Sequence, residues 1–151
     1  MSRGDAEAWF IAGAIVAMLA GGLHAFYALV DTVRPTYFAP RDRSVKPAME
    51  GTGLRLRRGV PGGNKARPSM WSAWLGFNIS HGLGAFSFGL LCLLIATHDF
   101  KLVEQIDAIR PLTIAVSATY FAVALRFWFY LPVIITGIPT ACFTIATVLS
   151  A

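Results

Sequence analysis

Four long apolar stretches dominate the pattern of hydrophobic and polar positions along the chain. They cover residues 9–30, 71–97, 112–129 and 131–150. A bilayer core of ~30 Å needs roughly 20 apolar residues in a helix that rises ~1.5 Å per residue, and each stretch is close to that length. Gly and Pro within them do not argue against helices, because both are commoner in membrane helices than in soluble ones. The pattern predicts four transmembrane helices.

The polar segment 31–69, between the first two apolar stretches, is the longest connection. Ser44 is expected to cap a short amphipathic helix with Val45 and Met49 on its apolar side. The glycine-rich turn 59–65 superficially resembles a phosphate loop, but it lacks the Ser or Thr and the preceding strand that such a loop needs. The segment is therefore interpreted as an interfacial loop without a nucleotide motif.

Composition supports a membrane protein with one domain over residues 1–151. Hydrophobic residues make up 56% of the chain and charged residues only 14%, whereas soluble domains carry about 25% charged residues. The first apolar stretch is too long for a cleaved signal and follows Asp5 and Glu7, so we expect it to be retained. The predicted fold class is all-α, an integral membrane four-helix bundle.

Basic residues are distributed unevenly between the two sides of the predicted bundle. One side, which includes the 31–69 loop, carries Arg34, Arg41, Arg43, Lys46, Arg55, Arg57, Arg58, Lys65, Arg67 and Arg126, and the other carries Arg3, Lys101 and Arg110. Lys and Arg collect on cytoplasmic sides, so both termini are predicted outside and the loop in the cytoplasm. The net charge of +5 then indicates attraction to anionic lipid head groups. Nucleic acid is not expected as a partner, because the loop has no aromatic or helical readout element.

Small residues recur every four positions on the first two predicted helices. They are Gly13, Ala17, Gly21 and Ala25 on the first, and Gly76, Ser80 and Gly84 on the second. Such spacing lets two helix backbones approach closely. We expect the first two helices to pack together through these faces, with self-association in a dimer as the alternative.

Polar residues at membrane depth form two further stripes at helical spacing. His24, Tyr27 and Asp31 share one face of the first helix, and Trp71, Trp74, Asn78, His81 and Ala85 share one face of the second. If the stripes face one another, they enclose a polar pocket that opens toward the cytoplasmic leaflet. Arg126, at the inner end of the third helix, would pair with Asp31 or reach the head groups.

Ionisable residues inside a membrane are expensive and mark candidate functional sites. His81 is the candidate catalytic residue, as a proton donor or acceptor, and the candidate ligand-binding residues are Asn78, Ser80, His24, Tyr27, Trp74, Arg126 and Asp31. Each also has a purely structural interpretation. Asn78 and His81 would bond neighbouring helices, His24 would be a packing residue, Arg126 an interfacial anchor and Asp31 a solvated or paired helix end.

No metal site or cofactor is predicted. His24 and His81 could ligate haem or a metal, but metal histidines usually need further ligands and an acceptor behind them, and the chain has no CxxC or HxxxH pattern. Cys92 and Cys142 fall at different depths of their helices, beyond the ~7 Å reach of a disulfide. Both are expected to be packed free thiols.

One stretch of the second helix resembles a known family. The residues that carry the resemblance are Asp31, Arg34-Pro35, Phe38, Pro40 and Met49, followed by Trp-x-x-Trp-x-Gly-Phe-Asn-x-Ser-His from Trp71 to His81. They are similar to a family of small bacterial four-helix inner-membrane proteins. The resemblance implies a location in the bacterial inner membrane, and it directs attention to Asn78, Ser80 and His81. In that membrane, the termini that the basic residues place outside would be periplasmic. It implies no particular reaction.

Three functions are compatible with these patterns. The first is binding of, or action on, a lipid-like or quinone-like molecule in the polar pocket. The second is a non-catalytic accessory or structural subunit, either as a homo-oligomer or within a larger membrane complex, which the small-residue faces would support. The third is a small oligomeric transporter or channel, ranked last because no internal repeat or broken helix is visible.

Overall fold

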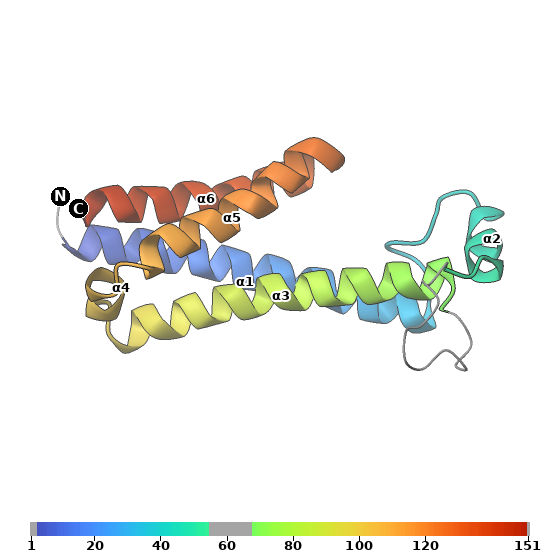
Figure 1. The fold of residues 1–151 in the computed structure, drawn as a ribbon, viewed down its shortest axis with the longest axis horizontal. Helices are drawn as coiled ribbons and strands as arrows, with labels where there is room; N and C mark the ends of the chain where they lie inside the picture. The colour runs from blue at the N-terminus through green and yellow to red at the C-terminus, as the bar shows by residue number, and fades with distance from the viewer. Residues whose placement is uncertain (1–2, 55–67, 151) are drawn as a thin grey trace, which may run out of the picture. The chain divides into compact units, whose positions relative to one another are not determined.

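The computed structural model describes residues 3–54 and 68–150, and these residues form six helices (Figure 1). The helices are α1 (Arg3–Val33), α2 (Val45–Gly51), α3 (Met70–His98), α4 (Lys101–Gln105), α5 (Ile109–Phe127) and α6 (Tyr130–Leu149). Within the described ranges there is no β-strand, only an isolated antiparallel bridge between Gly53 and Ser69. The predicted all-α class is confirmed.

Three of the helices in the described part of the chain are long and apolar enough to cross a membrane. These spans are Gly4–Val33, Met70–Asp99 and Tyr130–Leu149, with mean hydropathies of 1.8, 1.9 and 1.8. Helix α5 overlaps the third predicted stretch and has 19 residues, but it carries arginines near both ends and buries Thr113 and Ser117. The chain is therefore a membrane protein with three helices that qualify as spans by length and hydropathy.

The chain divides into two compact units. One comprises Met1–Gly22 and Gly84–Ala151, and the other comprises Leu23–Leu83. The first unit thus holds the beginning of α1, the end of α3 and all of α4, α5 and α6. The second holds the end of α1, α2 and the beginning of α3. The glycine-rich turn 59–65 lies outside the described residues. So do the basic residues between 55 and 67, which we predict to face the cytoplasm.

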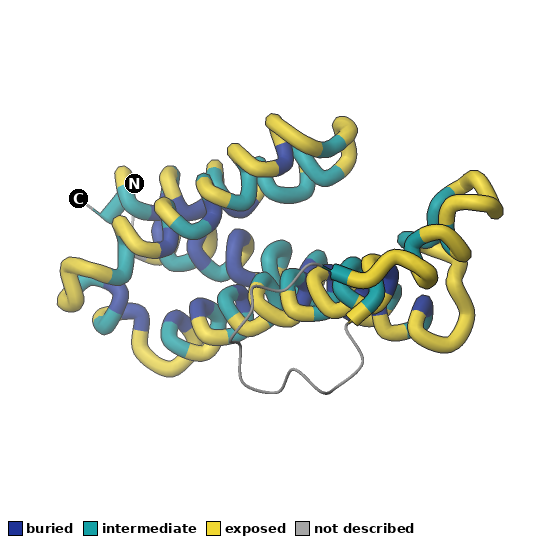
Figure 2. The backbone as a smooth tube through the Cα atoms, turned by 45° about the vertical axis from the view of Figure 1, so that its right-hand side comes forward, coloured by how far each residue is buried: buried dark blue, intermediate teal, exposed yellow. Residues whose placement is uncertain are grey.

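The core of the first unit gathers near the two ends of the chain, where Figure 2 shows most of the buried positions of this unit. The Phe10 ring meets the Phe143 ring edge-on at 5.0 Å between centroids and the Phe100 ring at 5.9 Å. Edge-to-face pairs of this kind contribute ~0.5–1.5 kcal/mol beyond their buried area. Ala6 and Ala146 complete the contact between the start of α1 and the end of α6.

Helices α1 and α3 approach closely in both units, as predicted. In the first unit, a Cβ added to Gly89 would collide with the backbone of Met18. In the second unit, a Cβ on Gly82 would lie 2.5 Å from the backbone nitrogen of Ala25. Only glycine lets the two backbones come this near.

The face of α3 that makes this contact is not the predicted one. Gly76 has nothing within 4 Å of an added Cβ, and Gly76, Ser80 and Gly84 are all exposed. The packing residues are instead Gly82 and Gly89, which are both buried. Gly82 and Gly89 are seven residues apart, which is nearly two helical turns. They therefore lie on one face of α3, as the predicted small residues do on theirs.

Two smaller predictions have different outcomes. Cys92 and Cys142 are buried free thiols, as expected. Helix α2 begins directly after Ser44, but the serine does not cap it. The Ser44 backbone N–H and hydroxyl donate instead to Asp42 Oδ1 at 2.8 and 2.7 Å, and these bonds lower the pKa of the Asp42 carboxyl.

Candidate functional site

The two polar stripes face one another in the second unit. His24 on α1 and Asn78 on α3 are joined by a hydrogen bond of 3.2 Å between Nε2 and Oδ1. The His24 and His81 rings lie 5.4 Å apart between centroids and meet edge to face. Both histidines are half-buried, whereas Asn78 is only 1% exposed. The result is a histidine pair, His24 and His81, with a buried amide behind it.

The amide of Asn78 determines where His24 carries a proton. Asn78 Nδ2 donates to the Trp74 carbonyl at 2.8 Å. A carbonyl oxygen can only accept, so the amide nitrogen must face Trp74 and the amide oxygen must face His24. That oxygen also only accepts, and His24 Nε2 therefore carries a hydrogen. In the neutral ring, Nδ1 is then the acceptor.

Asp31, at the end of α1, is fully buried and organises the turn that follows the helix. Its Oδ1 accepts the backbone N–H groups of Thr36 at 2.7 Å and Tyr37 at 2.9 Å. Its Oδ2 accepts the N–H of Phe38 at 2.6 Å and shares that of Tyr37 at 3.2 Å. Consecutive backbone N–H groups form a concave site for an anion, and here the chain's own carboxylate occupies it.

This carboxylate-held turn places Phe38 over the histidine pair. The Phe38 ring lies 4.7 Å from the His24 ring, and the Phe38 carbonyl accepts Trp74 Nε1–H at 3.2 Å. Tyr37 stacks on Tyr27 at 4.3 Å. Tyr27, Trp74 and Asp31 thus act on the histidine pair by fixing the turn around it.

Besides Phe38 in the turn, an aromatic ring on α3 flanks the pair. Phe77 stacks on His81 with centroids 5.6 Å apart and planes 21° apart, and 56% of its surface is exposed. Neither Phe38 nor Phe77 is predicted by a search for polar or ionisable residues. Phe77 nonetheless lies four positions before His81 on one helix face, and that spacing is a signal for it.

Ser80 does not join the pair, and Arg126 belongs to the other unit. Ser80 is exposed, and its hydroxyl donates to the Phe77 carbonyl of its own helix at 3.0 Å. Arg126 is exposed in the first unit, with its guanidinium carbon 5.2 Å from the centre of the Phe127 ring. The expected pairing of Arg126 with Asp31 stays a prediction.

Cationic side chains surround the second unit's turn and short helix. Arg34, Arg41 and Arg43 are exposed, and the Lys46 amine forms an ion pair with Glu50 and lies 5.3 Å from the centre of the Trp71 ring. A negatively charged group approaching this part of the unit would meet favourable charge.

The acidic residue nearest to the histidine pair along the His24 face is Asp31, whose carboxylate is bonded to three backbone N–H groups. Residues 3–54 and 68–150 contain no group of three or more His, Cys, Asp or Glu side chains placed to hold an ion. Whether His24 and His81 ligate haem or a metal stays a prediction.

Comparison of this chain with protein-family models, curated proteins and solved structures gave no match. Two half-buried imidazoles offer both a donor and an acceptor near neutral pH, with exposed aromatic surface beside them. This combination suits a molecule with a polar head and an apolar body.

Proposed function

We propose that this chain is a multi-pass inner-membrane protein that binds, or acts on, a lipid-like or quinone-like molecule at the histidine pair. The observation that supports the proposal most directly is the contact between His24 and His81, with Asn78 holding the His24 proton in place. Two imidazoles in contact supply a donor and an acceptor at one place near neutral pH. The flanking Phe38 and Phe77 rings provide apolar surface for the body of the ligand.

We further propose that α5 is a fourth crossing. In the first unit, the core joins the start of α1 to the end of α6 and the end of α3, through Phe10, Phe143 and Ala96. Helices α3 and α6 therefore run in the same direction, opposite to α1. The chain must return across the membrane between them, and α5 is the helix at that place. Its 19 residues are enough to span most of a ~30 Å core at ~1.5 Å each.

With four crossings, the two termini lie on one side, and we propose that this side is the periplasm. The exposed Arg34, Arg41 and Arg43 follow α1 directly, and basic residues beside a span favour the cytoplasmic side. The same residues would attract an anionic head group. The histidine pair would then be reached from the cytoplasmic leaflet.

In this function the two histidines have different roles. His24 is held with a hydrogen on Nε2 toward Asn78, so it orients the ligand through its other nitrogen. His81 meets the His24 ring edge to face and stacks on the exposed Phe77 ring, and it is the proposed proton donor or acceptor. Asn78 acts through His24 as a positioning residue.

Native mass spectrometry of the protein, extracted in mild detergent, tests this proposal. We expect the unsubstituted protein to retain a small amphiphile that both His24→Ala and His81→Ala lose. His98→Ala is the matched control, because His98 is exposed at the end of α3 and should leave the bound molecule in place. Retention of the same molecule by His81→Ala at unchanged occupancy would exclude the pair as its binding site.

A second candidate function is a non-catalytic accessory subunit, and the exposed small-residue face of α3 favours it. Gly76 has open space beside it, and the Ser80 hydroxyl is turned back to its own helix. A helix of another subunit could approach this face closely. Gly76→Leu should then release a partner that co-purifies in mild detergent. A monomer without partners before and after the substitution would count against this role.

A further inference from the structure

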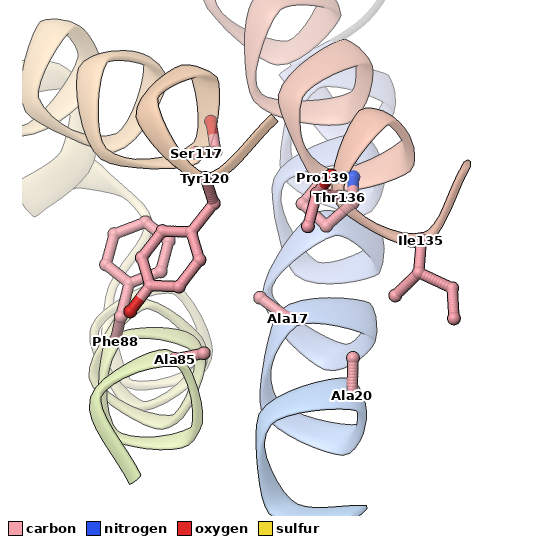
Figure 3. Close-up of a pocket in the computed structure, with 9 residues that line it drawn as sticks. All are labelled: Ala17, Ala20, Ala85, Phe88, Ser117, Tyr120, Ile135, Thr136 and Pro139. Carbon is pink, nitrogen blue, oxygen red and sulfur yellow. The ribbon is translucent and has the colours of Figure 1, made fainter. Parts of the chain in front are cut away.

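Four helices of the first unit surround a small cavity of about 50 Å³ that is open on one side (Figure 3). Helix α1 contributes Ala17 and Ala20, α3 contributes Phe88, α5 contributes Tyr120 and α6 contributes Pro139. All belong to one compact unit. The residues of the histidine pair belong to the other unit.

The wall of the cavity is almost wholly apolar because its hydroxyl groups are engaged elsewhere. Ser117 donates to the Ile114 carbonyl of its own helix at 3.1 Å, and Thr136 donates to the Pro132 carbonyl at 2.8 Å. A buried water needs two to four polar partners, and apolar cavities stay dry and accept apolar guests. The wall therefore selects against water and polar ligands.

The side chains and backbone around the cavity keep it from closing. Ala17 and Ala20 are too short to fill it. Pro139 lies inside α6 and has no N–H to bond the carbonyl four residues earlier, which bends a helix. The missing N–H of Pro139 and the short side chains of Ala17 and Ala20 all lie at the wall of this space.

We propose that this cavity binds the acyl chain of a bilayer phospholipid. The helices that form it include three that are long and apolar enough to cross a membrane, so the hydrocarbon of a bilayer is an apolar guest available to the cavity. An empty gap would deprive its lining atoms of dispersion contacts, and a hydrocarbon chain restores them without any hydrogen bond. A cavity of about 50 Å³ takes up only a short part of such a chain, and that part would contact α1, α5 and α6 together.

Photolabelling in vesicles tests this proposal. The protein is reconstituted into phosphatidylcholine vesicles that contain a phosphatidylcholine with a diazirine in its acyl chain, irradiated, digested and mapped by mass spectrometry. We expect adducts to concentrate at Ala17, Ala20 and Ile135, above the background on a lipid-exposed residue such as Leu19. Adducts spread evenly over the exposed apolar residues would overturn the proposal.

Two substitutions with opposite expected effects sharpen the test. Ala20→Leu fills the cavity and should remove the concentrated adducts. Ile135→Ala enlarges it and should increase them. Ala12→Leu, on the exposed face of the same helix, is the matched control and should change nothing. Unchanged labelling in Ile135→Ala and in a folded Ala20→Leu refutes the assignment. If Ala20→Leu does not fold, the result for Ile135→Ala decides.

Discussion

Substitution of Asp31 should release the carboxylate-held turn and uncover the histidine pair. Asp31 is fully buried and is bonded to three consecutive backbone N–H groups. Asn has nearly the same shape but carries an amide nitrogen in place of one oxygen. With its oxygen kept toward Thr36 and Tyr37, Asp31→Asn would place that nitrogen against the N–H of Phe38, and two donors cannot bond each other.

The size of the effect follows from the bonds that are lost. A hydrogen bond to a charged group contributes ~1.5–3 kcal/mol net. Asp31→Asn loses the bond to the Phe38 N–H altogether. Its bonds to the N–H groups of Thr36 and Tyr37 remain, but their acceptor is no longer charged. Residues 34–37 are exposed and Phe38 is partly exposed, so water can reach the released N–H groups. The expected penalty therefore stays close to the loss of one hydrogen bond to a charged group. We expect the turn to open about 2–3 kcal/mol more easily, with Asp31→Ala at least as large.

Hydrogen exchange of the backbone amides at 36–38 measures this opening directly. At 1.4 kcal/mol for each factor of ten, the expected change corresponds to roughly a 30- to 140-fold faster exchange in Asp31→Asn. The same variant should lose the contact of the Phe38 carbonyl with the Trp74 indole. The indole fluorescence of Trp74 should then shift toward that of a more hydrated ring.

Asp42→Asn is the control, because Asp42 is an exposed carboxylate in the same segment that bonds only locally to Ser44. It should leave exchange at 36–38 unchanged. The reasoning is refuted if Asp31→Asn exchanges at the original rate. Equal acceleration in both variants would also refute it, since it would indicate a general effect of charge.

Three further predictions concern the packing of the helices, each measured as a change in the free energy of unfolding in mixed detergent micelles. Gly82→Ala places a Cβ 2.5 Å from the Ala25 backbone and should cost ~1–3 kcal/mol, whereas Gly76→Ala should be neutral or stabilising by up to ~1 kcal/mol. Arg110→Ala removes the bonds to the end of α6 at 3.1 and 3.3 Å and should cost about 1 kcal/mol. Phe10→Ala should cost ~3–5 kcal/mol through the cavity left in the core; a cost below that of Arg110→Ala would contradict the assignment of this core.

Hydropathy predicts the long helices well because a membrane span is defined by a continuous apolar run. The predicted stretches 9–30, 71–97 and 131–150 all lie on helices that qualify as spans. The stretch 112–129 is harder to identify as a membrane span from its sequence. Helix α5 contains polar side chains that are buried in the fold, and these residues lower its mean hydropathy. Whether such a helix crosses depends on its neighbours and not on its own composition.

Helical spacing alone predicts which residues share a face, but not which face meets a partner. It correctly grouped His24 on α1 and Asn78 on α3, which meet in the structure. It grouped Gly76, Ser80 and Gly84 equally well, yet that face is exposed and Gly82 makes the contact. The choice between two faces depends on which one fits the opposite backbone, and only the folded arrangement contains that information.

The role of Asp31 could not be predicted, because its partners are backbone groups. Thr36, Tyr37 and Phe38 bond through their N–H groups, which every residue other than proline possesses. Nothing in their side chains marks them as partners of a carboxylate. A charge at a helix end is therefore ambiguous in sequence between a solvated residue and one that shapes the following turn.

The bonds of Asp31 also bear on the order in which the protein assembles. Its donors lie five to seven positions further along the chain, so the carboxylate can be satisfied as soon as the turn after α1 has been synthesised. The bond between His24 and Asn78 spans 54 positions and must wait until α3 has been inserted. Local contacts close early and distant ones late, because a longer loop costs more entropy to close. A nascent chain would thus carry a finished first helix and turn before the second half of the histidine pair exists.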